Sequence, residues 1–167
     1  MTNDNGLFVN TLEEYTESTL EDEINNRGGK KFKKFFEPNE IAFILKIIFK
    51  ALILLKFNNI SHGNIIPVNL FFLENGYTKL AGWHLENRKN WKCDFIDACS
   101  VIHSCVMLNI DNSVTQEKLN QNSVAYSRYP GLFEFLTKVL IYYAGGIIHM
   151  QNIEELKGEI KEIYYHL

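Results

Sequence analysis

The first long apolar stretch of the chain runs from Ile41 to Phe57 and is interrupted by three lysines. Lys46 and Lys50 stand four residues apart, so they share one face of a helix, while apolar residues cover most of the remaining surface. Pro38 lies just before this stretch and suits the first turn of a helix. The pattern predicts a buried helix from Pro38 to about Phe57 with a narrow polar edge.

Three further stretches have helical patterns. Residues 94–108 are apolar on almost every face, which predicts a second buried helix with Asp94 as its N-cap. The apolar residues of 132–143 recur with helical periodicity and stop before a pair of glycines. Residues 152–167 predict a last, amphipathic helix. Its inward-facing residues are expected to be Ile153, Leu156, Ile160 and Ile163.

Predicted β-structure is confined to short segments. Two apolar runs, 70–73 and 77–80, flank Asn75-Gly76, a pair typical of a tight turn, and predict a β-hairpin. Another short strand is possible at 7–9, and the polar stretch 109–128 predicts a loop with a short helix. We therefore expect a mainly α-helical fold in which residues 1–167 form a single domain with one small β-hairpin.

The segment before the first apolar helix is polar. Ser18 and Thr19 can cap a helix there, because they precede a cluster of acidic residues that favours a helix N-terminus. Arg27-Gly28-Gly29 predicts its end. The basic run Lys30–Lys34 predicts an exposed loop, and Phe35-Phe36 are expected to anchor the helix that follows.

Composition narrows the class of protein. The chain has 167 residues, of which 46% are hydrophobic and 22% charged, values typical of a soluble globular domain. A net charge of −3 argues against nucleic-acid binding by bulk electrostatics. The apolar stretch 41–57 is not expected to span a membrane, because each of its lysines would cost about 3 kcal/mol at the bilayer centre and a span needs about 20 residues.

The cysteines indicate a reducing compartment. Three cysteines are too few for a disulfide framework, and the polar start of the chain does not have the pattern of a secretory signal. We expect an intracellular, cytoplasmic protein. Cys99 and His103 stand four residues apart and could form a metal pair, but they lie in an apolar helix without a second pair of ligands. No metal or other cofactor is expected.

The segment Ile60-Ser61-His62-Gly63-Asn64-Ile65-Ile66-Pro67-Val68-Asn69-Leu70 is followed by a hairpin and then by Lys79-Leu80-Ala81-Gly82-Trp83. This order resembles the catalytic core of eukaryotic protein kinases, where H-R-D-L-K-P-x-N-L-L precedes a hairpin and K-L-x-D-F-G. The matching positions are His62, Pro67, Asn69, Leu70, Lys79 and Leu80. Asp94 resembles the aspartate at the start of the family's buried helix.

The resemblance covers about residues 7–167 and implies a kinase C-lobe. Residues 12–15 resemble the hinge, so the N-lobe with its glycine-rich loop and strand lysine would have to precede Met1. The stretch between His84 and Asp94 is too short for the family's activation loop. The implied fold is a kinase-like C-lobe without an N-lobe.

The positions that carry kinase chemistry are altered. Asn64 stands where the resemblance places the catalytic aspartate, and an amide cannot act as a base. Ile66 replaces the loop lysine, and Gly82 replaces the metal-binding aspartate. Asn69 remains, but one neutral amide will not hold Mg²⁺. The resemblance therefore implies a catalytically inactive pseudokinase.

The resemblance also implies structural roles. His62 is expected to be a buried structural residue, with Trp83 packed on it. In the family, the residue that matches Asp94 accepts hydrogen bonds from backbone N–H groups of the loop that is here His62-Gly63-Asn64. Asp94 should therefore be buried and structural.

The expected function is that of a protein-interaction or scaffold subunit of a larger complex. Without an N-lobe, an apolar patch would be left uncovered and could bind one or more proteins. Its expected members are Leu7, Phe8, Leu12, Phe71 and Trp83. Two alternatives remain open: a nucleotide sensor or kinase half completed in trans by a separate N-lobe, and a helical structural protein unrelated to kinases.

Overall fold

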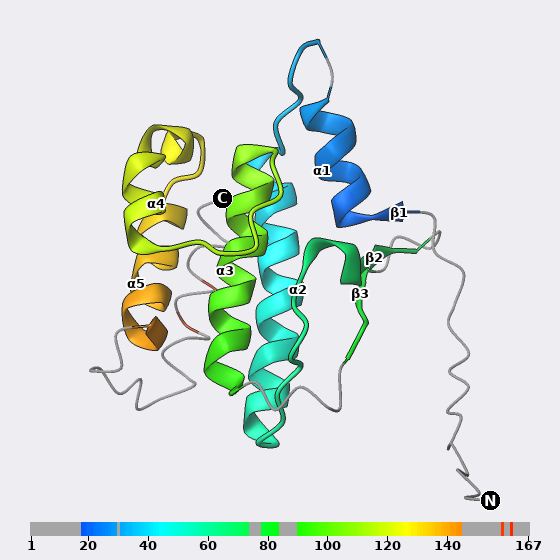
Figure 1. The fold of residues 1–167 in the computed structure, drawn as a ribbon, viewed down its shortest axis with the longest axis vertical. Coiled ribbons are helices and arrows are strands. Elements are labelled where there is room, and N and C mark those ends of the chain that lie inside the picture. Colours follow the sequence, from blue (N-terminus) through cyan, green and yellow to red (C-terminus); the bar gives the residue numbers. More distant parts are fainter. Residues whose placement is uncertain are drawn as a thin grey trace, which may run out of the picture.

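The computed structural model describes residues 18–29, 31–73, 78–83 and 90–144, together with Gly158 and Lys161. Helices dominate this part of the chain (Figure 1). The helices and strands are, in order, β1 (Ser18–Thr19), α1 (Leu20–Gly28), α2 (Pro38–Phe57), the 3-10 helix Pro67–Asn69, β2 (Leu70–Phe72), β3 (Thr78–Leu80), α3 (Trp91–Met107), α4 (Gln116–Gln121), the 3-10 helix Ser123–Arg128 and α5 (Leu132–Ala144). The expected mainly α-helical fold class is confirmed.

The helix α2 has the bounds that the sequence predicts. Pro38 occupies its first turn, and the Glu40 carboxylate accepts a hydrogen bond of 2.7 Å from the backbone N–H of Glu37. At the other end, the Asn58 side chain donates to the Leu54 carbonyl at 2.8 Å. Asn59 then adopts a left-handed conformation, with φ of 54°, and stops the helix. No helix in the described part of the chain is long and apolar enough to cross a membrane.

The helix α3 begins earlier than expected. Its N-cap is Asn90, whose side-chain oxygen accepts a hydrogen bond of 3.2 Å from the Lys92 N–H. The prediction that Asp94 caps this helix is therefore wrong, because Asp94 lies inside its first turn. The helix ends at Met107, and Leu108, its C-cap, is left-handed with φ of 53°.

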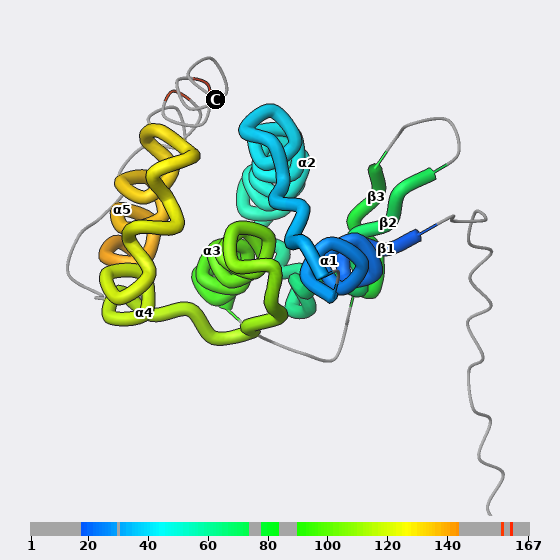
Figure 2. Tube along the Cα trace, turned by 90° about the horizontal axis from the view of Figure 1, so that it is seen from above, coloured from blue at the N-terminus to red at the C-terminus, as the bar shows by residue number. Residues whose placement is uncertain are grey.

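The surroundings of α3 explain why its sequence is apolar on almost every face. It lies between α2 and α5, while α1 and the sheet lie on the side away from α5 (Figures 1 and 2). Phe49 of α2 forms edge contacts with Phe95 of α3 and Phe135 of α5, with ring centroids 5.7 and 5.1 Å apart. A helix in this position must bury side chains on both sides.

The two polar serines of α3 hold the following loop. Ser100 Oγ accepts a hydrogen bond of 3.0 Å from the Val114 N–H, and Ser104 Oγ accepts one of 2.9 Å from the Asp111 N–H. Both serines are buried, so these bonds satisfy backbone groups that would otherwise be costly to bury.

The sheet contains one strand more than expected. β2 and β3 pair antiparallel, with Phe71 opposite Lys79, as the predicted hairpin requires. β1 adds a third strand at the edge, with Thr19 opposite Phe71. Thr19 also caps α1, since its hydroxyl accepts from the Asp22 N–H at 3.2 Å.

Some predicted elements fall outside the described residues. These are the strand at 7–9, the turn at Asn75-Gly76 and most of the amphipathic helix 152–167, of which only Gly158 and Lys161 are described, both as helical. The predicted short helix in 109–128 is confirmed by α4, and α5 closely matches the predicted helix 132–143. Whether residues 1–167 form a single domain stays a prediction.

Candidate functional site

The candidate site is built around Asp94, which joins α3 to the loop that follows α2. This carboxylate is 1% exposed. Oδ2 accepts hydrogen bonds from the His62 N–H at 2.7 Å and the Ser61 hydroxyl at 2.8 Å, and Oδ1 accepts from the Gly63 N–H at 2.8 Å. Asp94 therefore satisfies three donors of one loop, including two backbone N–H groups of the kind the resemblance implied.

His62 is the second buried polar residue of this loop. Its ring is 4% exposed, and neither ring nitrogen has a hydrogen-bond partner among the described residues. The Ala81 backbone lies near enough to favour the charged ring but not at hydrogen-bond geometry. Burial dominates and lowers the pKa of His62, against the opposing effect of the Asp94 carboxylate. Burial therefore favours the neutral form of the His62 ring.

Trp83 lies at the surface beside this loop. Its Nε1–H donates a hydrogen bond of 3.0 Å to the Ser61 carbonyl, and 51% of the residue is exposed. The structure thus ties Trp83 to the backbone one residue before His62. Direct packing of Trp83 on the His62 ring stays a prediction.

Asn64, Asn69 and Gly82, three positions that the resemblance associates with catalysis, lie together. The Asn64 amide donates to the Gly82 carbonyl at 3.1 Å, and the Asn69 amide donates to the Asn64 carbonyl at 3.0 Å. The Asn69 carbonyl in turn accepts from the Ala81 N–H at 2.8 Å. The Asn64 amide and the Asn69 backbone carbonyl therefore bond the loop to residues 81–82, and the Asn69 amide closes the loop on itself. Ile66, which lies between Asn64 and Asn69 in the sequence, is half-buried and brings no polar side chain to this loop.

Gly82 occupies a position that favours glycine for two reasons. Its φ of +73° lies in the left-handed region. A Cβ placed there would lie 2.5 Å from atoms of the Asn69 side chain. An aspartate at this position would therefore strain the backbone and displace Asn69.

The chemistry available at this loop is limited. Residues 61–73 and 78–83 contain no aspartate or glutamate. The Asp94 carboxylate, which comes from α3, is already bonded to Ser61, His62 and Gly63. The described residues contain no group of three His, Cys, Asp or Glu side chains that could hold a metal ion. The side-chain amides of Asn64 and Asn69 can donate and accept hydrogen bonds but cannot serve as a general base.

The expected apolar patch is partly described. Trp83 is exposed and Phe71 is half-buried, whereas Leu7, Phe8 and Leu12 lie outside the described residues. Val68, which the sequence analysis missed, is 40% exposed in the 3-10 helix of the same loop. The sequence held a signal for this exposure, because Pro67 and Asn69 on either side of Val68 interrupt the apolar run.

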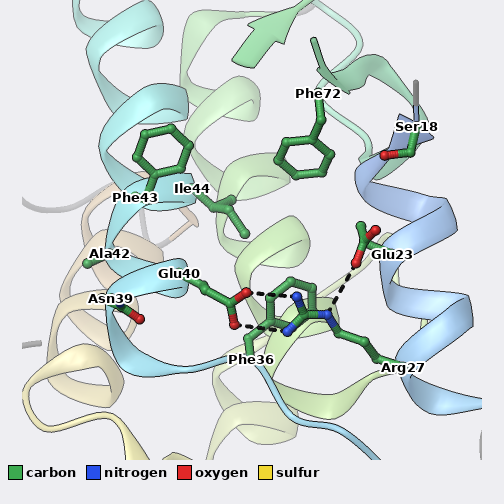
Figure 3. Close-up of a pocket in the computed structure, with 10 residues that line it drawn as sticks. All are labelled: Ser18, Glu23, Arg27, Phe36, Asn39, Glu40, Ala42, Phe43, Ile44 and Phe72. Atoms are coloured by element: carbon green, nitrogen blue, oxygen red, sulfur yellow. Dashed lines mark hydrogen bonds and ion pairs between the residues drawn. The ribbon is translucent and has the colours of Figure 1, made fainter. Parts of the chain in front are cut away.

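A cavity of about 740 Å³ lies between α1, α2 and β2. The rings of Phe43 and Phe72 face each other across it (Figure 3). At its base, Arg27 forms two hydrogen bonds with Glu40, of 2.9 and 2.7 Å, and its guanidinium lies 4.0 Å from the centre of the Phe36 ring. The cavity was not predicted, because its wall combines side chains from β1, α1, α2, β2 and the segment before α2.

The charges at the base of this cavity are paired. The Glu40 carboxylate raises the pKa of Arg27, and the Arg27 guanidinium lowers the pKa of Glu40. Arg27 also contacts Glu23 at 3.3 Å.

The buried Phe36 supports the prediction that Phe35-Phe36 anchor α2, while Phe32 is 81% exposed.

Cys99 and His103, the possible metal pair, are both buried in α3. His103 Nδ1 lies 2.6 Å from the Tyr126 hydroxyl, and its ring stacks on the Tyr126 ring. Cys99 is fully buried, which raises the pKa of its thiol. These residues belong to the core, as free buried thiols commonly do.

Comparison with known proteins gives no family assignment. The chain matches no protein-family model. A search of the curated proteins also finds no match. The residues and geometry of the loop around Asp94 are therefore the features that bear on function.

Proposed function

We propose that this chain is a catalytically inactive, kinase-like protein that acts as a protein-interaction subunit of a larger complex. One observation carries the proposal: the positions that resemble catalytic residues are used in internal hydrogen bonds. Asn64 donates to Gly82, and Asn69 donates to Asn64. At Gly82 a side chain would strain the backbone, and its Cβ would lie 2.5 Å from atoms of the Asn69 side chain. Such a loop supports a rigid surface rather than phosphoryl transfer.

The kinase-like part of the proposal is supported by the arrangement around Asp94. A buried carboxylate on the central helix accepts two backbone N–H groups from the loop after α2. The resemblance implied this bonding from sequence alone. The helix α3, whose start resembles that of the family's buried helix, lies between α2 and α5 (Figure 1).

The proposed partner surface centres on Trp83. Its indole is held by the bond to the Ser61 carbonyl, and half of the residue remains exposed. Val68 and Phe71 extend this surface along the same loop and strand. Tryptophan is enriched among residues that dominate binding energy, and an anchored ring loses little freedom on binding. We place the protein inside the cell, where its three free thiols would stay reduced.

The test is capture of partners from the native source by the tagged full chain, compared with two variants. Trp83→Asp should abolish capture, because it removes the aromatic anchor and adds a charge to an apolar contact. Val124→Asp is the matched control, since Val124 is 83% exposed and belongs to the distant 3-10 helix Ser123–Arg128. Normal capture by Trp83→Asp would place the partner surface elsewhere.

A further inference from the structure

The segment between α1 and α2 is the most basic stretch of the chain, and the proposed function does not use it. Residues 25–36 carry Arg27 and four lysines but no carboxylate. The whole chain has a net charge of −3, so this segment is opposite in sign to the protein as a whole. Lys31, Lys33 and Lys34 are exposed, and the first two have no ion-pair partner among the described residues.

The three phenylalanines of this segment have different surroundings. Phe36 is buried, and its carbonyl accepts a hydrogen bond of 2.8 Å from the Tyr129 hydroxyl. The Arg128 guanidinium lies 4.0 Å from the centre of the Phe35 ring. Phe32, which stands between two pairs of lysines, is 81% exposed. Two of the rings therefore pack against the body of the protein, and the third is left in solvent among positive charges.

The base of the segment is held, and its tip projects. The Lys34 N–H donates to the Arg27 carbonyl at 3.3 Å, which joins the two ends of the loop 28–33. Arg27 is itself fixed by two hydrogen bonds to Glu40. Figure 1 shows this loop as the outermost described part of the molecule at the end where α1 finishes. Phe32 and the lysines beside it are therefore presented together on a loop with anchored ends.

The shape and composition of this tip favour a lipid surface over a protein or a nucleic acid. A stable protein interface covers about 800 Å² on each partner, which a single projecting loop does not offer. Grooves that bind single-stranded nucleic acid combine basic residues with several stacking rings, whereas this tip has one ring. An exposed phenylalanine flanked by lysines suits the interface of an anionic bilayer, where a ring enters the headgroup region and lysines attract acidic lipids.

We propose that Phe32, with Lys31, Lys33 and Lys34, binds the surface of membranes that contain acidic lipids. The cytoplasmic leaflet of cell membranes carries such lipids. The net negative charge of the chain does not prevent this contact, because charges farther than about 10 Å are largely screened in 0.1 M salt. One loop of this kind gives a weak and reversible contact, since stable anchoring takes a second signal. The contact is additional to the surface at Trp83, and neither proposal depends on the other.

The test is co-sedimentation of the full chain with lipid vesicles. Vesicles of phosphatidylcholine alone are compared with vesicles that contain about one third phosphatidylserine. We expect at least about tenfold tighter binding to the acidic vesicles, and loss of this binding when the salt concentration rises from about 0.1 M to about 0.5 M.

Two pairs of variants locate the contact. Lys33→Glu should weaken binding to the acidic vesicles at least about fivefold, whereas Lys50→Glu, the same charge reversal at an exposed position of α2, should not. Phe32→Ser should weaken it at least about fivefold, whereas Phe57→Ser, at the far end of α2, should leave it unchanged. Phe57 is 76% exposed, so both serine variants remove an exposed ring. Circular dichroism checks that all four variants fold.

Fluorescence quenching reports whether the ring enters the bilayer. In Phe32→Trp, lipids brominated in their acyl chains should quench more fluorescence than they quench in the unmodified chain, where Trp83 and Trp91 give the background. Equal quenching of the two proteins would contradict the entry of this side chain.

Three further outcomes would overturn the proposal. The first is equal or absent binding to the two kinds of vesicle. The second is binding that Lys33→Glu and Phe32→Ser leave unchanged, which would place the lipid contact elsewhere. The third is tighter binding to a single-stranded oligothymidine or a polyglutamate peptide than to the acidic vesicles, with loss of that binding in Phe32→Ser. This result would assign the loop to a nucleic acid or to an acidic protein.

Discussion

Gly82 and Gly131 have the same backbone conformation but different surroundings. Their φ angles are +73° and +76°, so any other residue is strained at both. A Cβ at Gly82 would meet Asn69 at 2.5 Å, whereas a Cβ at Gly131 has no heavy atom within 4 Å. Comparing substitutions at the two glycines therefore distinguishes the effect of a steric clash at Gly82 from the effect of backbone strain, which both share.

We predict that Gly82→Ala destabilises the protein more than Gly131→Ala. The strain of a left-handed alanine costs about 1–2 kcal/mol at either position. Gly82→Ala should cost about 1 kcal/mol more, because displacing Asn69 breaks its bond to the Asn64 carbonyl. Denaturant unfolding measures both losses. Equal losses would mean that the loop tolerates a side chain at position 82.

The buried ring of His62 makes stability depend on pH. Its pKa is lowered in the folded protein, so between the folded and unfolded pKa values the unfolded chain binds more protons. The contribution of His62 is fully present above about pH 6.5, the ordinary histidine pKa. It is lost as the pH falls through that value toward the lower folded pKa.

We predict that the free energy of unfolding falls between pH 7.5 and pH 5.5, and that His62→Phe reduces this fall. A single histidine contributes at most about 1.4 kcal/mol per pH unit. His103, whose pKa burial also lowers, should retain its own share in the variant. Denaturant titrations at the two pH values give the difference. An unchanged pH dependence in His62→Phe would show that the pKa of His62 does not differ between the folded and unfolded states.

At the scale of elements, two residues share the roles that the sequence analysis gave to Asp94 alone: the N-cap of α3 and the acceptor for the loop. Asn90 caps α3, whereas Asp94 binds the loop at 61–63. We predict that Asp94→Ala costs about 2–4 kcal/mol, since it leaves buried N–H donors without an acceptor. Asn90→Ala should cost about 1 kcal/mol, the usual value of an N-cap.

Denaturant unfolding of the two variants gives this comparison directly. A loss of about 1 kcal/mol or less for Asp94→Ala, no larger than that of the cap variant, would contradict the role of Asp94 as the residue that holds the loop. It would also weaken the kinase-like interpretation, in which this aspartate joins the central helix to the loop.

The elements that could be predicted from the sequence are those with long, regular apolar patterns. The bounds of α2 followed from its apolar run, Pro38 and the polar residues after Phe57. The start of α3 was misplaced because Asp94 and Asn90 are both good capping residues, and tertiary hydrogen bonds decide between them. β1 has two residues and pairs with a strand about fifty positions away, so no local pattern indicates it.

In the candidate site too, some features could be predicted from the sequence and others depend on the folded chain. The resemblance identified Asn64, Ile66, Gly82 and Asp94, and it implied the bonds from the loop backbone to Asp94. It could not show that the Asn64 amide reaches the Gly82 carbonyl, because that bond depends on side-chain torsions. The cavity at Phe43 was also beyond it, since Phe72 and Arg27 approach α2 only in the folded chain.

At the scale of the whole molecule, α3 joins the core to the candidate site. Its Phe95 lies in the aromatic cluster with Phe49, while Asp94 beside it binds the loop. The loop and its exposed Trp83 are therefore attached to the most buried helix of the described part. We expect a surface supported in this way to change shape little when a partner binds.

The central claim is that the loop around Asn64 and Gly82 supports a surface and does not handle nucleotide. The most direct measurement is the melting temperature of the full chain with and without millimolar Mg-ATP, beside an active kinase catalytic domain as positive control. A ligand raises the melting temperature only if it binds the native state. We predict no shift for this chain and no transfer of phosphate to generic substrates. A reproducible, dose-dependent rise of several degrees would contradict the account.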